Sequence, residues 1–176
     1  DADQAAAVAH VEPLIHEFSA QYQAAYNTMM SNKLGCVAAD EHTTLLADEL
    51  LTLMQEHELD YTNTFNGLRL QLQASNPTAA PSPHLQAWQS RWLAYLNQQH
   101  ITTSTAAELM RITNPQVIPR NHHVEALLAD FERGIPTAIE EFLAVLRSPY
   151  HALDSTAQYQ DTPTDGDKFY RTFCGT

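Results

Sequence analysis

The stretch VAHVEPLIHEFSAQYQAAYNTM, residues 8–29, decides the fold class of this chain. Its apolar residues recur every three or four positions, which is the spacing of one face of an α-helix. The members of this stripe are Val8, Val11, Ile15, Phe18, Tyr22, Tyr26 and Met29. Pro13 interrupts the pattern near its start, where a proline removes one helical hydrogen bond. We therefore expect a long helix whose apolar stripe faces the core.

Helical spacing continues beyond this stretch. Asn32-Lys33-Leu34-Gly35 ends the first helix, and Asp40 is placed to cap a second one. A third helix is expected over residues 61–72, although Gly67 weakens it by about 1 kcal/mol relative to alanine. The positions expected to point inward in these two helices are Leu45, Leu46, Leu50, Leu53, Met54, Phe65, Leu68 and Leu72.

Residues 75–83 carry three prolines and predict a loop, which is the best candidate for an internal linker. An aromatic-rich helical stripe follows it: Leu85, Trp88, Trp92, Tyr95 and Leu96. Aromatic residues at this spacing are typical of a core-facing helix, and an aromatic platform for a ligand is the alternative.

The C-terminal third contains shorter helical segments. Ser104 is placed to cap a helix that Asn114-Pro115 stops, and a helix over residues 121–133 ends at Gly134. The next helix starts near Pro136 and is expected to face inward with Ile139, Phe142, Leu143 and Leu146. The pattern predicts an all-α fold: an irregular bundle of about six or seven helices over residues 1–147, followed by a long extended arm over residues 148–176.

Charge and composition exclude several classes of partner. Nine Lys and Arg residues face twenty-one Asp and Glu residues, and the net charge of −12 repels nucleic-acid phosphates and anionic lipids. No apolar run reaches the length of a membrane span, and the start lacks the basic region of a signal peptide. Two distant cysteines make no disulfide framework, so we expect a cytoplasmic protein. The start lies inside a helical pattern, from which we expect a piece of a longer chain.

The usual nucleotide-binding motifs are missing from the sequence. A phosphate cradle needs clustered glycines, whereas the five glycines here are dispersed. There is also no Walker A pattern and no kinase glycine-rich loop, HRD or DFG motif. We therefore expect no nucleotide site within this chain itself.

The nine histidines do not form a recognisable metal motif. HExxH is absent, and His122 and His123 are expected to diverge because adjacent residues point in different directions on a helix. Asp161, Asp165 and Asp167 do not fit the calcium-loop template, which ends in a glutamate. The sequence therefore predicts no metal site.

Several short motifs follow one another in a distinctive order. They are Asn32-Lys33-Leu34-Gly35, LLTLM at 50–54, DYTNTF at 60–65, NPQVIPRNH at 114–122, LRSPY at 146–150 and YRTFCGT at 170–176. Each is weak alone, but their order and spacing resemble the C-terminal region of the selenoprotein O family, which includes the YdiU-type proteins of bacteria. Two positions depart from the family pattern: Cys36 stands where leucine is expected, and Asn66 where arginine commonly occurs. We expect Cys36 to act as a small buried apolar residue, and a second redox partner is the alternative.

The resemblance implies a protein-kinase-like parent that transfers AMP from ATP to serine, threonine or tyrosine hydroxyls of proteins, with Mg²⁺ or Mn²⁺. In the family, the residues that do this lie in a larger N-terminal portion, so we expect no catalytic, cofactor-binding or metal-binding residue in this chain. That N-terminal portion and the protein substrates are the implied partners, in the bacterial cytoplasm.

The resemblance also singles out Cys174, because animal members carry selenocysteine at the third position from the end. It implies a redox-active thiol, which we expect to form a disulfide with a cysteine of the N-terminal portion. For Arg120 and His122 we expect packing roles, with Arg120 pairing with a carboxylate of the full-length protein; catalysis is the alternative. The rival function for the whole chain is a non-catalytic helical protein-interaction module.

Overall fold

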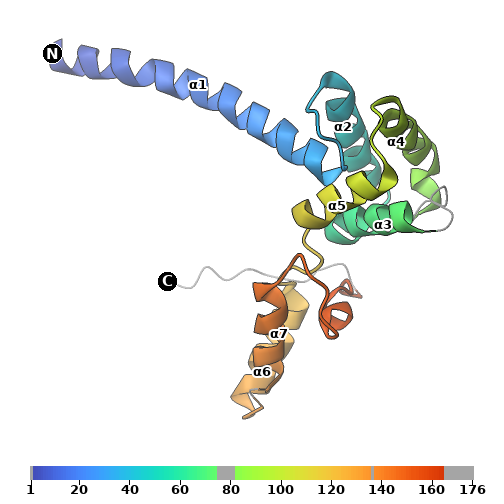
Figure 1. The fold of residues 1–176 in the computed structure, drawn as a ribbon. Helices are drawn as coiled ribbons and strands as arrows, with labels where there is room; N and C mark the ends of the chain where they lie inside the picture. The colour runs from blue at the N-terminus through green and yellow to red at the C-terminus, as the bar shows by residue number, and fades with distance from the viewer. Residues whose placement is uncertain (1, 75–81, 136, 165–176) are drawn as a thin grey trace.

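The fold is described from a computed structural model, which covers residues 2–74, 82–135 and 137–164 (Figure 1). The helices are α1 (Ala2–Lys33), α2 (Glu41–Glu56), α3 (Tyr61–Gln73), α4 (Gln86–Gln98), α5 (Thr103–Thr113), α6 (Asn121–Glu132) and α7 (Thr137–Arg147), with short 3₁₀ helices η1 (Pro83–Leu85) and η2 (Thr156–Tyr159). These described residues contain no β-strand. The predicted all-α class is confirmed.

Helices α2 to α5 and the end of α1 enclose the larger of two apolar cores. Trp88 and Trp92 lie at its centre, and each indole N–H donates to a backbone carbonyl: Trp88 to Leu46 at 2.8 Å and Trp92 to Leu34 at 2.9 Å. These bonds satisfy the polar edge of each buried ring. The aromatic stripe of α4 is therefore core, as its spacing predicts.

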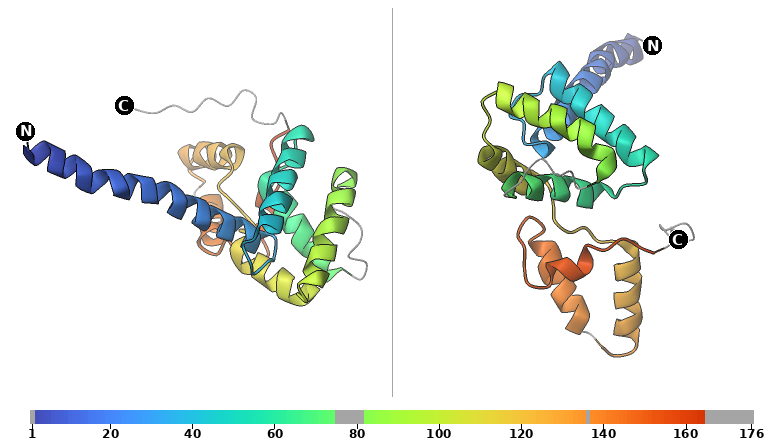
Figure 2. Two further views of the ribbon diagram at one scale, coloured as in Figure 1. Left: turned by 90° about the horizontal axis from the view of Figure 1, so that it is seen from above. Right: turned by 90° about the vertical axis from the view of Figure 1, so that its right-hand side faces the viewer.

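A smaller core lies between α6, α7 and η2, and the ribbon views show it as a separate body below the main bundle (Figures 1 and 2). Its buried members are Val117, Leu127, Phe142, Val145 and Tyr159. Leu143, expected to face inward, is 41% exposed. Tyr159 comes from the segment after α7, so the first part of the predicted arm folds back onto the helices.

The apolar stripe of α1 does not face the core, contrary to the sequence prediction. Phe18 and Tyr22 are 67% and 60% exposed, and Val8, Val11, Ile15 and Met29 are exposed as well. The helix projects away from the bundle (Figures 1 and 2). Of the stripe, only Tyr26 packs partly against the larger core, and full burial begins at Met30. Periodicity identified the helix correctly, but it cannot say whether the apolar face is covered within the same chain.

Most helix ends follow the predicted signals. Asp40 caps α2, Asn114 follows the last residue of α5, and Gly134 has a positive φ of 82° just after α6. Two details differ. Thr102, and not Ser104, accepts the capping hydrogen bond of α5, and Leu45 of α2 is exposed.

The predicted linker at 75–83 lies mostly outside the described residues, and the division at residue 147 stays a prediction. None of the helices in the described part combines the length and hydropathy needed to cross a bilayer.

Candidate functional site

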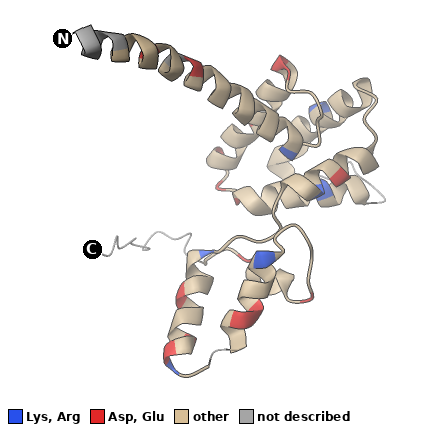
Figure 3. Cartoon of the chain, turned by 60° about the vertical axis from the view of Figure 1, so that its left-hand side comes forward, with Lys and Arg blue, Asp and Glu red and all other residues tan. Residues whose placement is uncertain are grey.

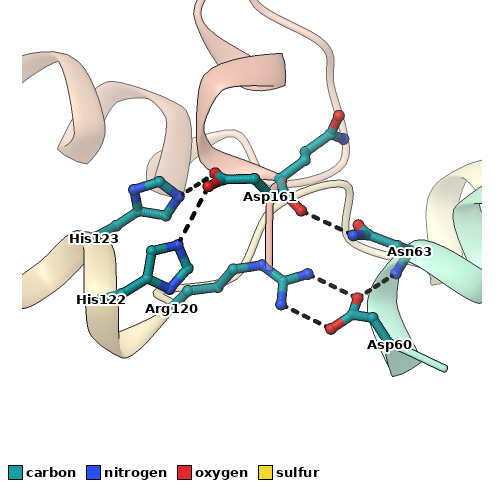
Figure 4. A network of polar contacts seen from close by, with 7 residues as sticks. Asp60, Asn63, Arg120, His122, His123 and Asp161 are labelled. Atoms are coloured by element: carbon teal, nitrogen blue, oxygen red, sulfur yellow. Dashed lines mark hydrogen bonds and ion pairs between the residues drawn. The ribbon is translucent and has the colours of Figure 1, made fainter. Parts of the chain in front are cut away.

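Residues from three distant parts of the chain meet where the two bodies join (Figure 4). Asp60 and Asn63 come from the start of α3, Arg120 and His122 from the start of α6, and Asp161 from the segment after η2. The first four belong to two of the motifs singled out in the sequence. Motifs about 60 residues apart therefore form one polar site, which we call the junction.

Asp60 serves two partners at once. Its Oδ1 accepts the backbone N–H of Asn63 at 2.8 Å and so caps α3, while Arg120 donates one hydrogen bond to each carboxylate oxygen at 2.7 Å. Arg120 immediately precedes α6, so this bidentate pair ties together the starts of two helices. The carboxylate partner expected for Arg120 is, in this structure, Asp60 of the same chain.

Opposing effects act on the Asp60 carboxyl. Partial burial raises its pKa, but the hydrogen bonds and charge of Arg120 and the backbone N–H groups of Asn63 and Thr62 outweigh burial. The pKa of Asp60 is therefore lowered overall, and the ionised form is stabilised.

Amide side chains reinforce the junction. Asn63 Nδ2 donates to the carbonyl of Gln160 at 2.8 Å, and Asn66 Nδ2 donates to the carbonyl of Pro115 at 2.9 Å. Gln160 Nε2 in turn donates to the carbonyl of Gln116, also at 2.9 Å. Asn66, a departure from the family pattern, is thus used to hold the linker between α5 and α6.

His122 and His123 converge and do not diverge. Their ring centroids are 4.1 Å apart, and both Nε2 atoms face Asp161: His123 at 2.7 Å from Oδ1 and His122 at 3.6 Å from Oδ2 (Figure 4). The His123 ring packs edge-on against Tyr159, which fixes its orientation. The prediction failed because His122 lies in the first turn of α6, where the side chain can turn back towards the junction.

The two histidines also affect Asp161. Its slight burial raises the carboxyl pKa, whereas the hydrogen bond and charge of His123 and the charge of His122 lower it. The lowering effects outweigh burial, so the pKa of Asp161 is lowered overall. Both ring nitrogens of His122 are shielded from solvent and lack a hydrogen-bond partner among the described residues. Such groups lose the hydrogen bonds they would make with water, which costs about 1–3 kcal/mol each.

Comparison with known proteins assigns the chain to a family. A family model described as protein adenylyltransferase SelO matches residues 4–147. This chain belongs to the SelO family. Two similar relatives are named protein nucleotidyltransferase YdiU. The protein from Teredinibacter turnerae is 39% identical over all of this chain, and that from Pseudoalteromonas translucida is 38% identical over 99% of it.

The chain spans 36% and 35% of the lengths of these two SelO relatives. Both relatives are named as nucleotidyltransferases, so nucleotidyl transfer is the general activity associated with the family. The junction described above lies within or just beyond the residues that the family model matches.

Of the two cysteines in this SelO-family chain, Cys36 is described. It is fully buried in the larger core, as predicted, and burial together with the charge of Asp40 raises the pKa of its thiol to about 12, although a hydrogen bond with Trp92 opposes this. Cys174, with Asp165 and Asp167, lies outside the described residues.

A second feature is a surface pocket of about 370 Å³ between α2 and α4. Its lining includes His42, Glu49, Arg91 and Tyr95, and Arg91 pairs with Glu49. The pocket contains none of the motifs that the sequence singled out, so the junction is the stronger candidate site. The sequence pattern singles out Arg120 and His122 and contains Asp60 in a motif, but it gives no partner for Asp60 and presents Asp161 only as a rejected calcium ligand, because their roles depend on long-range contacts.

Proposed function

We propose that this chain is the helical C-terminal region of a protein adenylyltransferase that transfers AMP from ATP to serine, threonine or tyrosine hydroxyls of other proteins. The family match over residues 4–147 carries this proposal. The nucleotide and its Mg²⁺ or Mn²⁺ would be held by the remaining part of the full-length protein. This region would support the kinase-like portion and contribute no catalytic residue.

The exposed face of α1 is the proposed docking surface for that remaining portion. Phe18 and Tyr22 stack along it at 6.3 Å, and residues 18–32 contain no charged side chain, so this stretch of the helix is tan in Figure 3. A projecting helix gains little stability from propensity alone and normally needs an amphipathic face to be covered. Each large apolar side chain buried there contributes about 1.5–3 kcal/mol. The relatives, which are nearly three times as long, have ample chain to cover this face.

We also propose that Cys174 is a redox switch. Its thiol and a cysteine thiol of the remaining portion would lose two electrons and two protons to a disulfide oxidant such as oxidised glutathione, which is reduced to two thiols. The new disulfide would pin the C-terminal arm and change the rate of AMP transfer. The support is the position of Cys174 in the terminal motif of the family.

The decisive experiment measures AMP transfer by the full-length protein. With ATP and Mg²⁺, intact-mass analysis of the protein and of candidate substrates should show additions of one AMP, whereas the 176-residue chain alone should give none. Complete absence of transfer by well-folded full-length protein would exclude the proposed activity and favour the interaction-module alternative.

Two variants test the finer proposals in the full-length protein. Cys174→Ser should abolish any dependence of AMP transfer on reductant, and persistence of that dependence rejects the switch. Phe18→Asp combined with Tyr22→Asp should lower stability or solubility of the full-length protein but leave the melting temperature of the 176-residue chain nearly unchanged. An equal loss in both proteins would mean that the α1 face is not a docking surface.

A further inference from the structure

We propose that His122, His123 and Asp161 form a binding site for a divalent transition-metal ion, with zinc the best match. The proposal is independent of AMP transfer and departs from the expectation that this chain holds no metal ligand. One ligand atom from each residue lies within 4.8 Å of the other two. The ligand atoms are Nε2 of each histidine and an oxygen of Asp161.

The three ligand atoms, all within 4.8 Å of one another, are close enough for one ion, but the side chains must adjust to reach tetrahedral separations. Two ligands bound to zinc at about 2.0–2.1 Å with tetrahedral angles lie roughly 3.3 Å apart. His122 Nε2 is 3.6 Å from Asp161 Oδ2, close to this separation, while His123 Nε2 is 2.7 Å from Oδ1, the length of a hydrogen bond. A modest rotation of Asp161 admits the ion between them. The Asp161 side chain is 64% exposed, which gives it room to rotate and gives the ion a path from solvent.

The chemistry of the donors selects the ion. Two imidazole nitrogens and one carboxylate suit zinc and its transition-metal neighbours, whereas Mg²⁺ and Ca²⁺ prefer oxygen ligands throughout. Three protein ligands leave a fourth position for water. A metal at His122 Nε2 would also give a ligand bond to a shielded nitrogen that has no hydrogen bond among the described residues and only a 3.6 Å contact with Asp161.

The surroundings hold the ligands in place. The His123 ring contacts Tyr159 and Phe142 of the smaller core. The carbonyl next to Asp161, that of Gln160, is anchored by Asn63 at 2.8 Å, and the start of α6 is fixed by Arg120. A bound ion would therefore link the start of α6 to the segment after η2, and so stabilise the junction of the two bodies.

The test is zinc binding by the 176-residue chain carrying Cys174→Ser, which removes a competing thiol. Titration against a chromophoric chelator should reveal one Zn²⁺ per chain, and Co²⁺ should give the visible d–d absorption of tetrahedral nitrogen and oxygen ligation. His122→Gln, His123→Gln and Asp161→Asn should each weaken binding at least tenfold, since even loss of an outer partner of a ligand costs about 10–100-fold.

The matched control is His57→Gln with His84→Gln, which removes a second pair of stacked histidine rings, 3.8 Å apart. This control should keep full affinity. Zinc should also raise the melting temperature of the Cys174→Ser chain and of the control, but not that of Asp161→Asn. The Asp161 side chain is largely exposed, so this substitution should not unfold the chain. The proposal is overturned if the Cys174→Ser chain binds no zinc, or if the control loses binding and the three site variants keep it.

Discussion

Arg120 donates two parallel hydrogen bonds to Asp60, both 2.7 Å long, across 60 residues of sequence. The side chains of this pair are 8% and 22% exposed, so the pair is largely removed from water. Since Asp60 caps α3 and Arg120 precedes α6, this ion pair connects the smaller body to the larger one, together with the amide hydrogen bonds of Asn63 and Asn66.

Replacing Arg120 should destabilise this junction strongly. Arg120→Ala leaves the partly buried Asp60 carboxylate without its main partner, and we expect the free energy of unfolding to fall by about 3 kcal/mol. Arg120→Lys should give an intermediate loss, because lysine keeps the charge but not the two-pronged geometry. Urea unfolding followed by circular dichroism measures both changes.

The control for this prediction is the exposed pair Arg133–Asp130, three residues apart at the end of α6. Arg133→Ala should cost under about 1 kcal/mol, as is usual for surface ion pairs. Equal losses for Arg120→Ala and Arg133→Ala would mean that burial adds nothing to the Asp60 pair.

The same pair predicts a dependence of stability on pH. The pKa of Asp60 is lowered in the folded state relative to about 3.9 for an unfolded aspartate, so its contribution is fully present above about pH 4. It is lost as the pH falls through the lower, folded value, where the carboxylate is protonated. The difference in unfolding free energy between the unsubstituted 176-residue chain and its Asp60→Asn variant should therefore be constant from pH 7 to pH 5 and shrink towards pH 3. A difference that stays constant down to pH 3 would contradict the assignment.

Two glycines allow steric clash to be separated from backbone strain. Gly35 and Gly134 have similar positive φ values, 72° and 82°, but a Cβ at Gly35 would meet the Cβ and carbonyl oxygen of Ala106 at 2.8 Å, while one at Gly134 would meet nothing within 4 Å. Gly134→Ala should cost about 1–2 kcal/mol from the left-handed backbone alone. Gly35→Ala should cost clearly more, because α5 must also move. Thermal unfolding of both variants checks this, and equal costs would exclude the clash.

Local signals in the sequence were sufficient for most helices and their ends. The capping roles of Asp40 and Gly134 depend on residues only a few positions away, so they follow from short-range rules. Asn114 follows α5 as predicted, but its side chain also bonds to Lys33, 81 residues away. The spacing of Trp88 and Trp92 likewise places both on one face of α4, a pattern typical of a core-facing helix.

The candidate site could not be predicted in the same way. Asp60 pairs with Arg120, and Asn63 bonds to the residue before Asp161, through contacts between segments 60 and 97 residues apart, which no helical period encodes. The error over Phe18 and Tyr22 has a related cause. A stripe shows which face of α1 is apolar, but the partner that covers it is determined outside the helix.

Thiol labelling tests the contrast between the two cysteines. Cys36 is fully buried and its pKa is raised to about 12, so at pH 8 only roughly one thiol in ten thousand is ionised and able to attack an alkylating reagent. We expect the folded 176-residue chain to take up one iodoacetamide group, at Cys174, and the chain in guanidinium to take up two. Cys174→Ser should therefore remain unlabelled when folded, whereas Cys36→Ala should still accept one group. Rapid labelling of Cys36 in the folded chain would show that the core around Leu34 and Trp92 opens readily, because a closed core leaves that thiol neither ionised nor accessible.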